Sequence, residues 1–164
     1  MFRLVDWMTV TIYRAGWAPT AVFLIFLAWV QGISVFALVP YSDIPMHFLG
    51  GVAIAYFWHT ASIVGSERGL LGVWHPTTHG LLVFGWTTVA AIVWEFAEFT
   101  LDRLTGSQLQ GGGEWGALAD TFKDVLLGMA GSGCWVLFVS LLGRKVSSPS
   151  SGQQNIEQGG GVPA

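Results

Sequence analysis

Two glutamates inside an apolar segment are the most chemically unusual feature of this sequence. Glu95 and Glu98 lie within Thr88–Leu101, a stretch otherwise apolar enough to cross a bilayer. Placing an ionised carboxylate in hydrocarbon costs about 2.5–3.5 kcal/mol on insertion scales. The spacing of three residues puts both side chains on one face of a helix. We therefore expect that face to meet protein, a metal or a water-filled cavity.

Two further pairs of polar residues have a spacing of four. Asp43 and His47 begin one apolar segment, and Asp120 and Asp124 begin another. Each pair shares a helix face, and an up-and-down bundle would bring their ends to one rim. Lys123 lies beside the second pair, and Trp94 lies beside the glutamates. The candidate polar site comprises Asp43, His47, Trp94, Glu95, Glu98, Asp120, Lys123 and Asp124.

Three kinds of chemistry fit this set of residues. Carboxylate ligands favour Mg²⁺, Ca²⁺ or Mn²⁺, and a histidine admits Zn²⁺ or Fe²⁺. The candidate ligands of such a divalent metal are His47, Glu95, Glu98, Asp120 and Asp124. A second interpretation is a site for a lipid or another ligand without a metal. A third is a network that locks the bundle, in which aspartates favour helix N-termini and Lys123 pairs with an acid. The sequence leaves all three open.

Composition places the chain in a membrane. Its 164 residues are 52% apolar and 10% charged, whereas soluble domains carry roughly 25% charged residues. The predicted fold is all-α, a polytopic membrane four-helix bundle with an N-terminal interfacial helix. A net charge of −3 without a basic run argues against nucleic acid as a partner. The single cysteine excludes a disulfide framework within the chain.

The bundle is predicted to occupy residues 18–143. Residues 1–17 are read as an interfacial amphipathic segment and residues 144–164 as a disordered cytoplasmic tail. The four spans are predicted at about residues 20–39, 46–64, 78–99 and 125–142. Glycines on the second and fourth spans predict close contact between helices. These glycines are Gly50, Gly51, Gly128, Gly131 and Gly133.

Basic residues predict the orientation of the bundle. Five of the seven lie on the side that holds both termini, which the positive-inside rule makes cytoplasmic. They are Arg3, Arg14, Arg68, Arg144 and Lys145. The opposite face carries seven of the ten acids, namely Asp43, Glu95, Glu98, Asp102, Glu114, Asp120 and Asp124. We thus expect a multi-pass protein of the bacterial cytoplasmic (inner) membrane with an acidic outer, periplasmic rim.

A second cluster of histidines is predicted on the cytoplasmic side. It contains His59, His75 and His79. His75 and His79 are four residues apart, but Pro76 interrupts the helix between them, so a shared face is doubtful. Interfacial or loop histidines are the favoured interpretation, and a zinc site is the alternative.

The motifs resemble those of VanZ-like membrane proteins and of the related YjdF-like inner-membrane proteins. The matching strings are Asp43-x-x-x-His47, Trp94-Glu95-x-x-Glu98 and Asp120-x-x-x-Asp124 followed by Gly131. The resemblance covers about residues 41–131. Ile44, Glu98 and Gly128 depart from the usual VanZ-like pattern of lysine, glutamine and asparagine, which favours the YjdF-like branch. The resemblance implies a small bundle in the bacterial cytoplasmic membrane, from a family whose founding members are linked to glycopeptide-antibiotic resistance.

Three functions follow as hypotheses. The first is a binding protein, with the lipid bilayer as its environment, whose acidic rim recognises an envelope lipid, a cell-wall precursor or a cation. The second is a metal-assisted hydrolase acting on a lipid-linked substrate, with His47 or Glu98 as base. The third is a proton- or cation-coupled transporter, which would require a homo-oligomer because four short spans make an incomplete path.

Overall fold

The fold is built from helices alone in the part of the chain that the structure describes. This computed structural model describes residues 2–32, 43–72, 75–106, 109–110 and 113–146. The helices are α1 (Phe2–Ala15), α2 (Trp17–Gly32), α4 (Asp43–Glu67), α5 (Pro76–Thr105) and α6 (Glu114–Val146). No strand occurs among these residues, so the predicted all-α class is confirmed.

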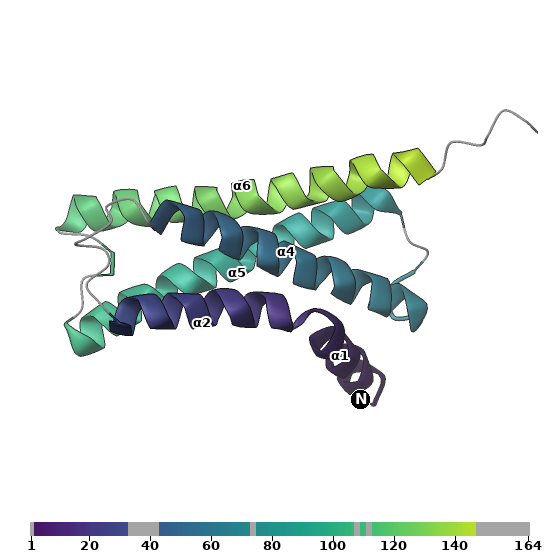
Figure 1. Ribbon diagram of the computed structural model, residues 1–164, viewed down its shortest axis with the longest axis horizontal. Coiled ribbons are helices and arrows are strands. Elements are labelled where there is room, and N and C mark those ends of the chain that lie inside the picture. The colour runs from purple at the N-terminus through teal and green to yellow at the C-terminus, as the bar shows by residue number, and fades with distance from the viewer. Residues whose placement is uncertain (1, 33–42, 73–74, 107–108, 111–112, 147–164) are drawn as a thin grey trace, which may run out of the picture.

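Helix α4 is the centre of the assembly. It packs against α1, α2, α5 and α6. Helices α4, α5 and α6 alternate in direction, so the start of α4, the end of α5 and the start of α6 lie at one end of the molecule (Figure 1). We call this the acidic end, because it holds the candidate polar site. Helix α2 runs toward the same end, and α1 turns away at the other (Figure 1).

Three helices are long and apolar enough to cross a membrane. They are α4, α5 and, within α6, residues 115–142. Helices α1 and α2 meet at Gly16 with a bend of 62°, and together they are also long and apolar enough to cross a membrane. If this pair forms one broken span, the described residues contain up to four spans. Membrane-spanning helices are thus confirmed, whereas a four-helix bundle with an interfacial α1 stays a prediction.

Helices α4, α5 and α6 are longer than the spans that hydropathy predicts for them. Helix α5 continues to Thr105, and α6 begins at Glu114, so the connection between them spans only residues 106–113. Helix α6 ends at Val146, inside the predicted tail, and residues 147–164 lie outside the described residues, as does the 33–39 part of the first predicted span. Hydropathy detects the apolar part of a helix, whereas charged residues such as Asp102 and Lys123 continue the helix beyond it.

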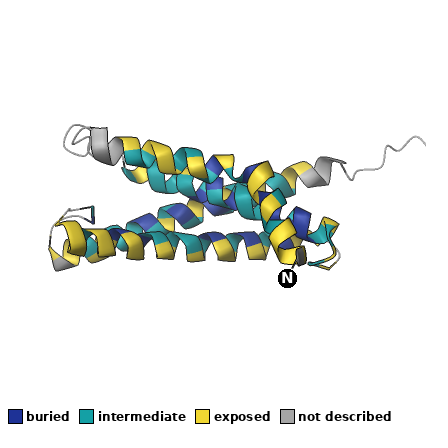
Figure 2. Cartoon of the chain, turned by 90° about the horizontal axis from the view of Figure 1, so that it is seen from below, coloured by how far each residue is buried: buried dark blue, intermediate teal, exposed yellow. Residues whose placement is uncertain are grey.

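Small residues make the core of the bundle. Its fully or largely buried positions include Gly51, Ala53, Ala55, Ala61 and Val64 on α4. Large apolar side chains instead cover the outward faces of the helices, where exposed residues predominate (Figure 2). This arrangement is expected in lipid, where apolar side chains can face outward and small residues let backbones approach.

The crossing of α4 and α6 is the closest contact in the core. A Cβ atom built on Gly51 would lie 2.1 Å from the Gly128 carbonyl oxygen, and one on Gly131 would lie 2.2 Å from that of Phe48. The predicted close contact is therefore confirmed for Gly51, Gly128 and Gly131. The prediction is wrong for Gly133, where an added Cβ atom would have no neighbour within 4 Å among the described atoms. A Cβ atom on Gly50 would make only an ordinary contact, at 3.9 Å from Val22.

Candidate functional site

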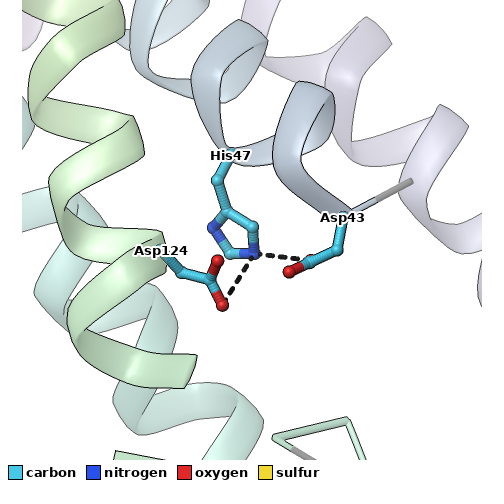
Figure 3. A group of neighbouring side chains, drawn as sticks. All are labelled: Asp43, His47 and Asp124. Carbon is cyan, nitrogen blue, oxygen red and sulfur yellow. Dashed lines mark ion pairs between the residues drawn. The ribbon is translucent and has the colours of Figure 1, made fainter. Parts of the chain in front are cut away.

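His47 lies at the centre of the polar cluster. Its position, one turn inside α4, directs the imidazole toward α5 and α6. Its Nε2 lies 3.0 Å from Asp43 Oδ1 and 3.6 Å from Asp124 Oδ2. Its Nδ1 lies 3.8 Å from Glu95 Oε1. Figure 3 shows the imidazole held between Asp43, on its own helix, and Asp124, on α6. One histidine thus joins carboxylates from three helices.

Lys123 neutralises the outer part of the cluster. Its Nζ lies 2.9 Å from Asp43 Oδ2, 2.5 Å from Asp120 Oδ1 and 3.3 Å from Asp124 Oδ1. The lysine side chain is 39% exposed, whereas that of Asp124 is 3% exposed. The expectation that Lys123 pairs with an acid is confirmed, and it pairs with three. Asp120 enters the cluster through this lysine.

Glu95 and Glu98 form the inner part of the cluster. They are 3% and 5% exposed, respectively. Trp94 Nε1 donates a hydrogen bond of 2.8 Å to Glu98 Oε1, which fixes that carboxylate one turn along α5. Glu95 Oε2 is buried and makes no hydrogen bond with the described residues. The sequence predicted that both glutamates face protein, a metal or a water-filled cavity, and the structure buries both side chains.

Hydrogen bonds of Leu109 and Gln110 link the end of α5 to the start of α6, and they were not foreseen from the sequence. Asp102 accepts hydrogen bonds from the backbone N–H groups of Leu109, at 2.9 Å, and Gln110, at 3.1 Å. Buried Gln110 then donates through Nε2 to the Glu95 carbonyl oxygen, at 3.1 Å, and to Thr121 Oγ1, at 3.2 Å. A glutamine in a glycine-rich stretch carries no sequence signal for such a role.

We expect Gln110→Ala to lower stability by about 1–2 kcal/mol, because it leaves a buried carbonyl and hydroxyl without their donor. Thermal unfolding of purified protein in detergent measures the effect. Thr100→Ala is the control on α5: that hydroxyl is exposed and bonds only the preceding turn, so its loss should fall within about 0.5 kcal/mol. Equal effects would show that Gln110 does not stabilise the link between α5 and α6.

A cavity of about 280 Å³ lies between α2 and the other three long helices. Most of its wall is apolar and comes from Val22, Phe23 and Phe26 on α2 and from residues such as Ile54 and Ala91. Trp94 also lines it, and stacks edge-on against Phe26 with ring centres 4.8 Å apart. The polar part of the wall consists of Asp43, His47, Thr87 and Asp124. The cavity therefore joins an apolar chamber to the polar cluster.

The three histidines of the second cluster line a different cavity, of about 810 Å³. His59 comes from α4, His75 precedes α5, and His79 lies in its first turns. Among the described residues, these histidines do not form a group of three or more metal-ligating side chains whose ligand atoms lie within 4.8 Å of one another. The zinc alternative for these histidines therefore gains no geometric support here.

Two groups in the polar cluster have the spacing of metal ligands. One is Asp43, His47 and Asp124, and the other is His47, Glu95 and Glu98; within each group, one ligand atom per residue lies within 4.8 Å of the others. We call them the outer and inner groups. Of the candidate metal ligands, Asp120 belongs to neither group.

Apolar helices surrounding buried carboxylates define a helical integral membrane protein. The chain belongs to the family described as predicted membrane proteins (DUF2238), whose model matches residues 9–145. Neither a curated protein nor a solved structure matches the chain. The family match supports a small membrane protein, and it leaves the function to be argued from the site.

Proposed function

We propose that this protein binds an amphiphilic component of the bacterial envelope through a cationic group. The observation that carries the proposal is the cavity beside the polar cluster, with apolar walls from α2, α4 and α5 and a polar end at Asp43, His47 and Asp124. Ligand sites of this kind combine apolar walls with few polar groups. The volume of about 280 Å³ is near the lower end of the roughly 300–1,000 Å³ usual for such sites, which suits one chain segment rather than a whole lipid.

Charge determines which end group fits. Within 4 Å of His47 and Lys123 lie the carboxylates of Asp43, Glu95, Asp120 and Asp124. Four carboxylates thus face one lysine and one histidine. A cationic group, such as a protonated amine, is attracted to this excess of negative charge, and an anionic head group is repelled.

The proposed location is the bacterial cytoplasmic membrane, crossed several times, with both termini in the cytoplasm and the acidic end outside. The supporting observation is the distribution of basic residues, which follows the positive-inside rule. The closer kinship to VanZ-like and YjdF-like proteins also stays a proposal. Its motifs lie on α5 (Trp94 to Glu98) and α6 (Asp120 to Gly131), and they supply Glu95, Glu98 and Asp124 to the groups around His47.

Native mass spectrometry of the detergent-purified protein tests the binding proposal. We expect retention of phosphatidylethanolamine, which carries an amine, in preference to phosphatidylglycerol with identical acyl chains, which carries none. Gly50→Leu should lower retention at least tenfold, because Gly50 lines the cavity and has room for a Cβ. Gly85→Leu is the matched control, since Gly85 lies outside the cavity lining and has no neighbour within 4 Å. Equal retention of the two lipids, or equal effects of the two variants, would refute the proposal.

A metal-assisted hydrolase acting on a lipid-linked substrate is the second candidate. The observation that favours it is the presence of two histidine–carboxylate groups with ligand spacing beside the cavity. A metal there would polarise an ester or phosphate oxygen and lower the pKa of a bound water. The two candidates differ in the fate of the amphiphile: a binding protein releases it intact, and a hydrolase releases its fragments.

A further inference from the structure

We propose that the inner group, His47, Glu95 and Glu98, binds one divalent transition-metal ion. One ring nitrogen of His47 and one carboxylate oxygen from each glutamate lie within 4.8 Å of one another. We assign the nitrogen to Nδ1, which lies 3.8 Å from Glu95 Oε1. At metal–ligand distances of about 2.0–2.2 Å, neighbouring ligands stand roughly 3–3.6 Å apart. Ligand atoms at the upper limit of 4.8 Å would have to approach one another by about 1–2 Å to close on an ion. The inference goes beyond the proposed function and does not depend on lipid binding.

The distribution of cations separates the inner group from the outer one. In the outer group, Lys123 Nζ lies 2.9 Å from Asp43 and 3.3 Å from Asp124, so an ammonium already supplies positive charge. Among the described residues, no lysine or arginine forms an ion pair with Glu95 or Glu98. The inner group therefore holds two carboxylates whose nearest basic partner is one imidazole.

Glu95 provides an independent indication of a ligand. It is 3% exposed, and its Oε2 makes no hydrogen bond with the described residues. Buried carboxylate oxygens are normally paired or bound to a metal, because leaving one unsatisfied is costly. Its Oε1 lies 3.8 Å from His47 Nδ1, which is beyond hydrogen-bonding range. A metal ion bound by Nδ1 and by both carboxylate oxygens of Glu95 would satisfy all three atoms.

The surroundings of His47 and Glu98 orient them as ligands. His47 Nε2 lies 3.0 Å from Asp43 and 3.6 Å from Asp124, so these carboxylates favour a proton on Nε2 and leave the lone pair on Nδ1. Metal-bound histidines usually have such a carboxylate at their other nitrogen. The Trp94 indole holds Glu98 through a 2.8 Å hydrogen bond. The inner group thus has partners that fix two of its three members.

The ligand types indicate the class of metal. Two carboxylates and one imidazole suit Mn²⁺, Fe²⁺ or Zn²⁺ better than Ca²⁺, which prefers six to eight oxygen ligands. Three protein ligands also leave coordination positions for water or a substrate.

Elemental analysis of the full-length protein in detergent, after removal of any tag, incubation with Mn²⁺ or Zn²⁺ and desalting, tests the site. We expect about one ion per chain. Glu95→Gln should weaken binding at least tenfold, because it removes a charged ligand and keeps the side-chain size. Asp120→Asn is the matched control: it also removes a carboxylate at the acidic end, but one bound to Lys123, so affinity should change less than twofold. Metal-free wild-type protein, or equal losses in the two variants, would overturn the assignment.

A measurement on the wild type covers the case in which Glu95→Gln fails to fold. Pulsed electron paramagnetic resonance of the Mn²⁺-loaded protein should show coupling to the nitrogen of one directly bound imidazole. Trp94→Phe, which retains all three ligands but removes the hydrogen bond to Glu98, should lower affinity about 10–100-fold. Absence of nitrogen coupling would exclude His47 as a ligand and overturn the proposal.

Discussion

Lys123→Met should be the most destabilising single substitution at the acidic end. It removes the ammonium that lies 2.5–3.3 Å from Asp43, Asp120 and Asp124. Breaking a fully buried ion pair from one side costs about 3–5 kcal/mol, because it leaves an uncompensated charge. The lysine is 39% exposed and water will screen part of that cost, so we expect a loss of about 2–3 kcal/mol.

The surface pair between Arg14 and Glu67 provides the control for this experiment. Its atoms are 2.9 Å apart, but its side chains are 47% and 49% exposed. Arg14→Met should therefore cost only about 0–1 kcal/mol. The double variant Asp120→Asn with Lys123→Met should recover part of the loss, because one of the stranded carboxylates becomes neutral. Thermal unfolding of the four proteins in detergent decides the outcome. Similar losses for Lys123→Met and Arg14→Met would mean that the lysine is not structurally required.

Gly131→Ala should be the second most damaging change. Its Cβ would lie 2.2 Å from the Phe48 carbonyl oxygen and 3.0 Å from the Val52 nitrogen, so α4 and α6 must separate. Overpacking of this kind costs about 1–3 kcal/mol or more. The same displacement would draw Asp124 on α6 away from His47 on α4, so the variant should disturb the polar cluster as well as the packing.

Gly133→Ala provides the matched control two residues away on the same helix. That glycine has no neighbour within 4 Å among the described atoms, so an added methyl group meets open space. Alanine is favoured over glycine in a helix interior by about 0.5–1 kcal/mol. Opposite signs for the two variants in thermal unfolding are the expected result. An unchanged unfolding temperature for Gly131→Ala would show that α4 and α6 cross at a greater distance than the structure has.

The helical class and the membrane spans could be predicted because they depend on composition and hydropathy alone. Which of the acidic residues become buried depends instead on how the helices pack. Asp124, Gly128 and Gly131 follow one another at spacings of four and three, and the glycines bring this face of α6 against α4. Asp124 is therefore buried at 2% exposure, whereas Asp120, one turn earlier, pairs with Lys123, which also contacts Asp43 at the start of α4. Their spacing alone does not distinguish the two aspartates, so both were predicted as candidate metal ligands.

Contacts across the chain were the part that the sequence could not predict. Phe23 and Phe26 are ordinary apolar residues of α2, and nothing in their spacing indicates that they meet Trp94 and line the cavity. The role of Gln110 depends likewise on the hydrogen bonds that the Leu109 and Gln110 backbone N–H groups donate to the Asp102 carboxylate. Such positions are determined by tertiary packing rather than by local pattern.

The shared imidazole of His47 has a thermodynamic consequence. The same ring faces Asp43 and Asp124 through one nitrogen and Glu95 through the other, and it also lines the cavity. If both proposals hold, an ion that fixed the ring at Nδ1 would change what the cavity presents to an amphiphile, and the two affinities would be linked. Linkage is reciprocal: the factor by which the metal alters affinity for the amphiphile equals the factor by which the amphiphile alters affinity for the metal. His47 would thereby couple the metal site and the amphiphile site of this small membrane protein.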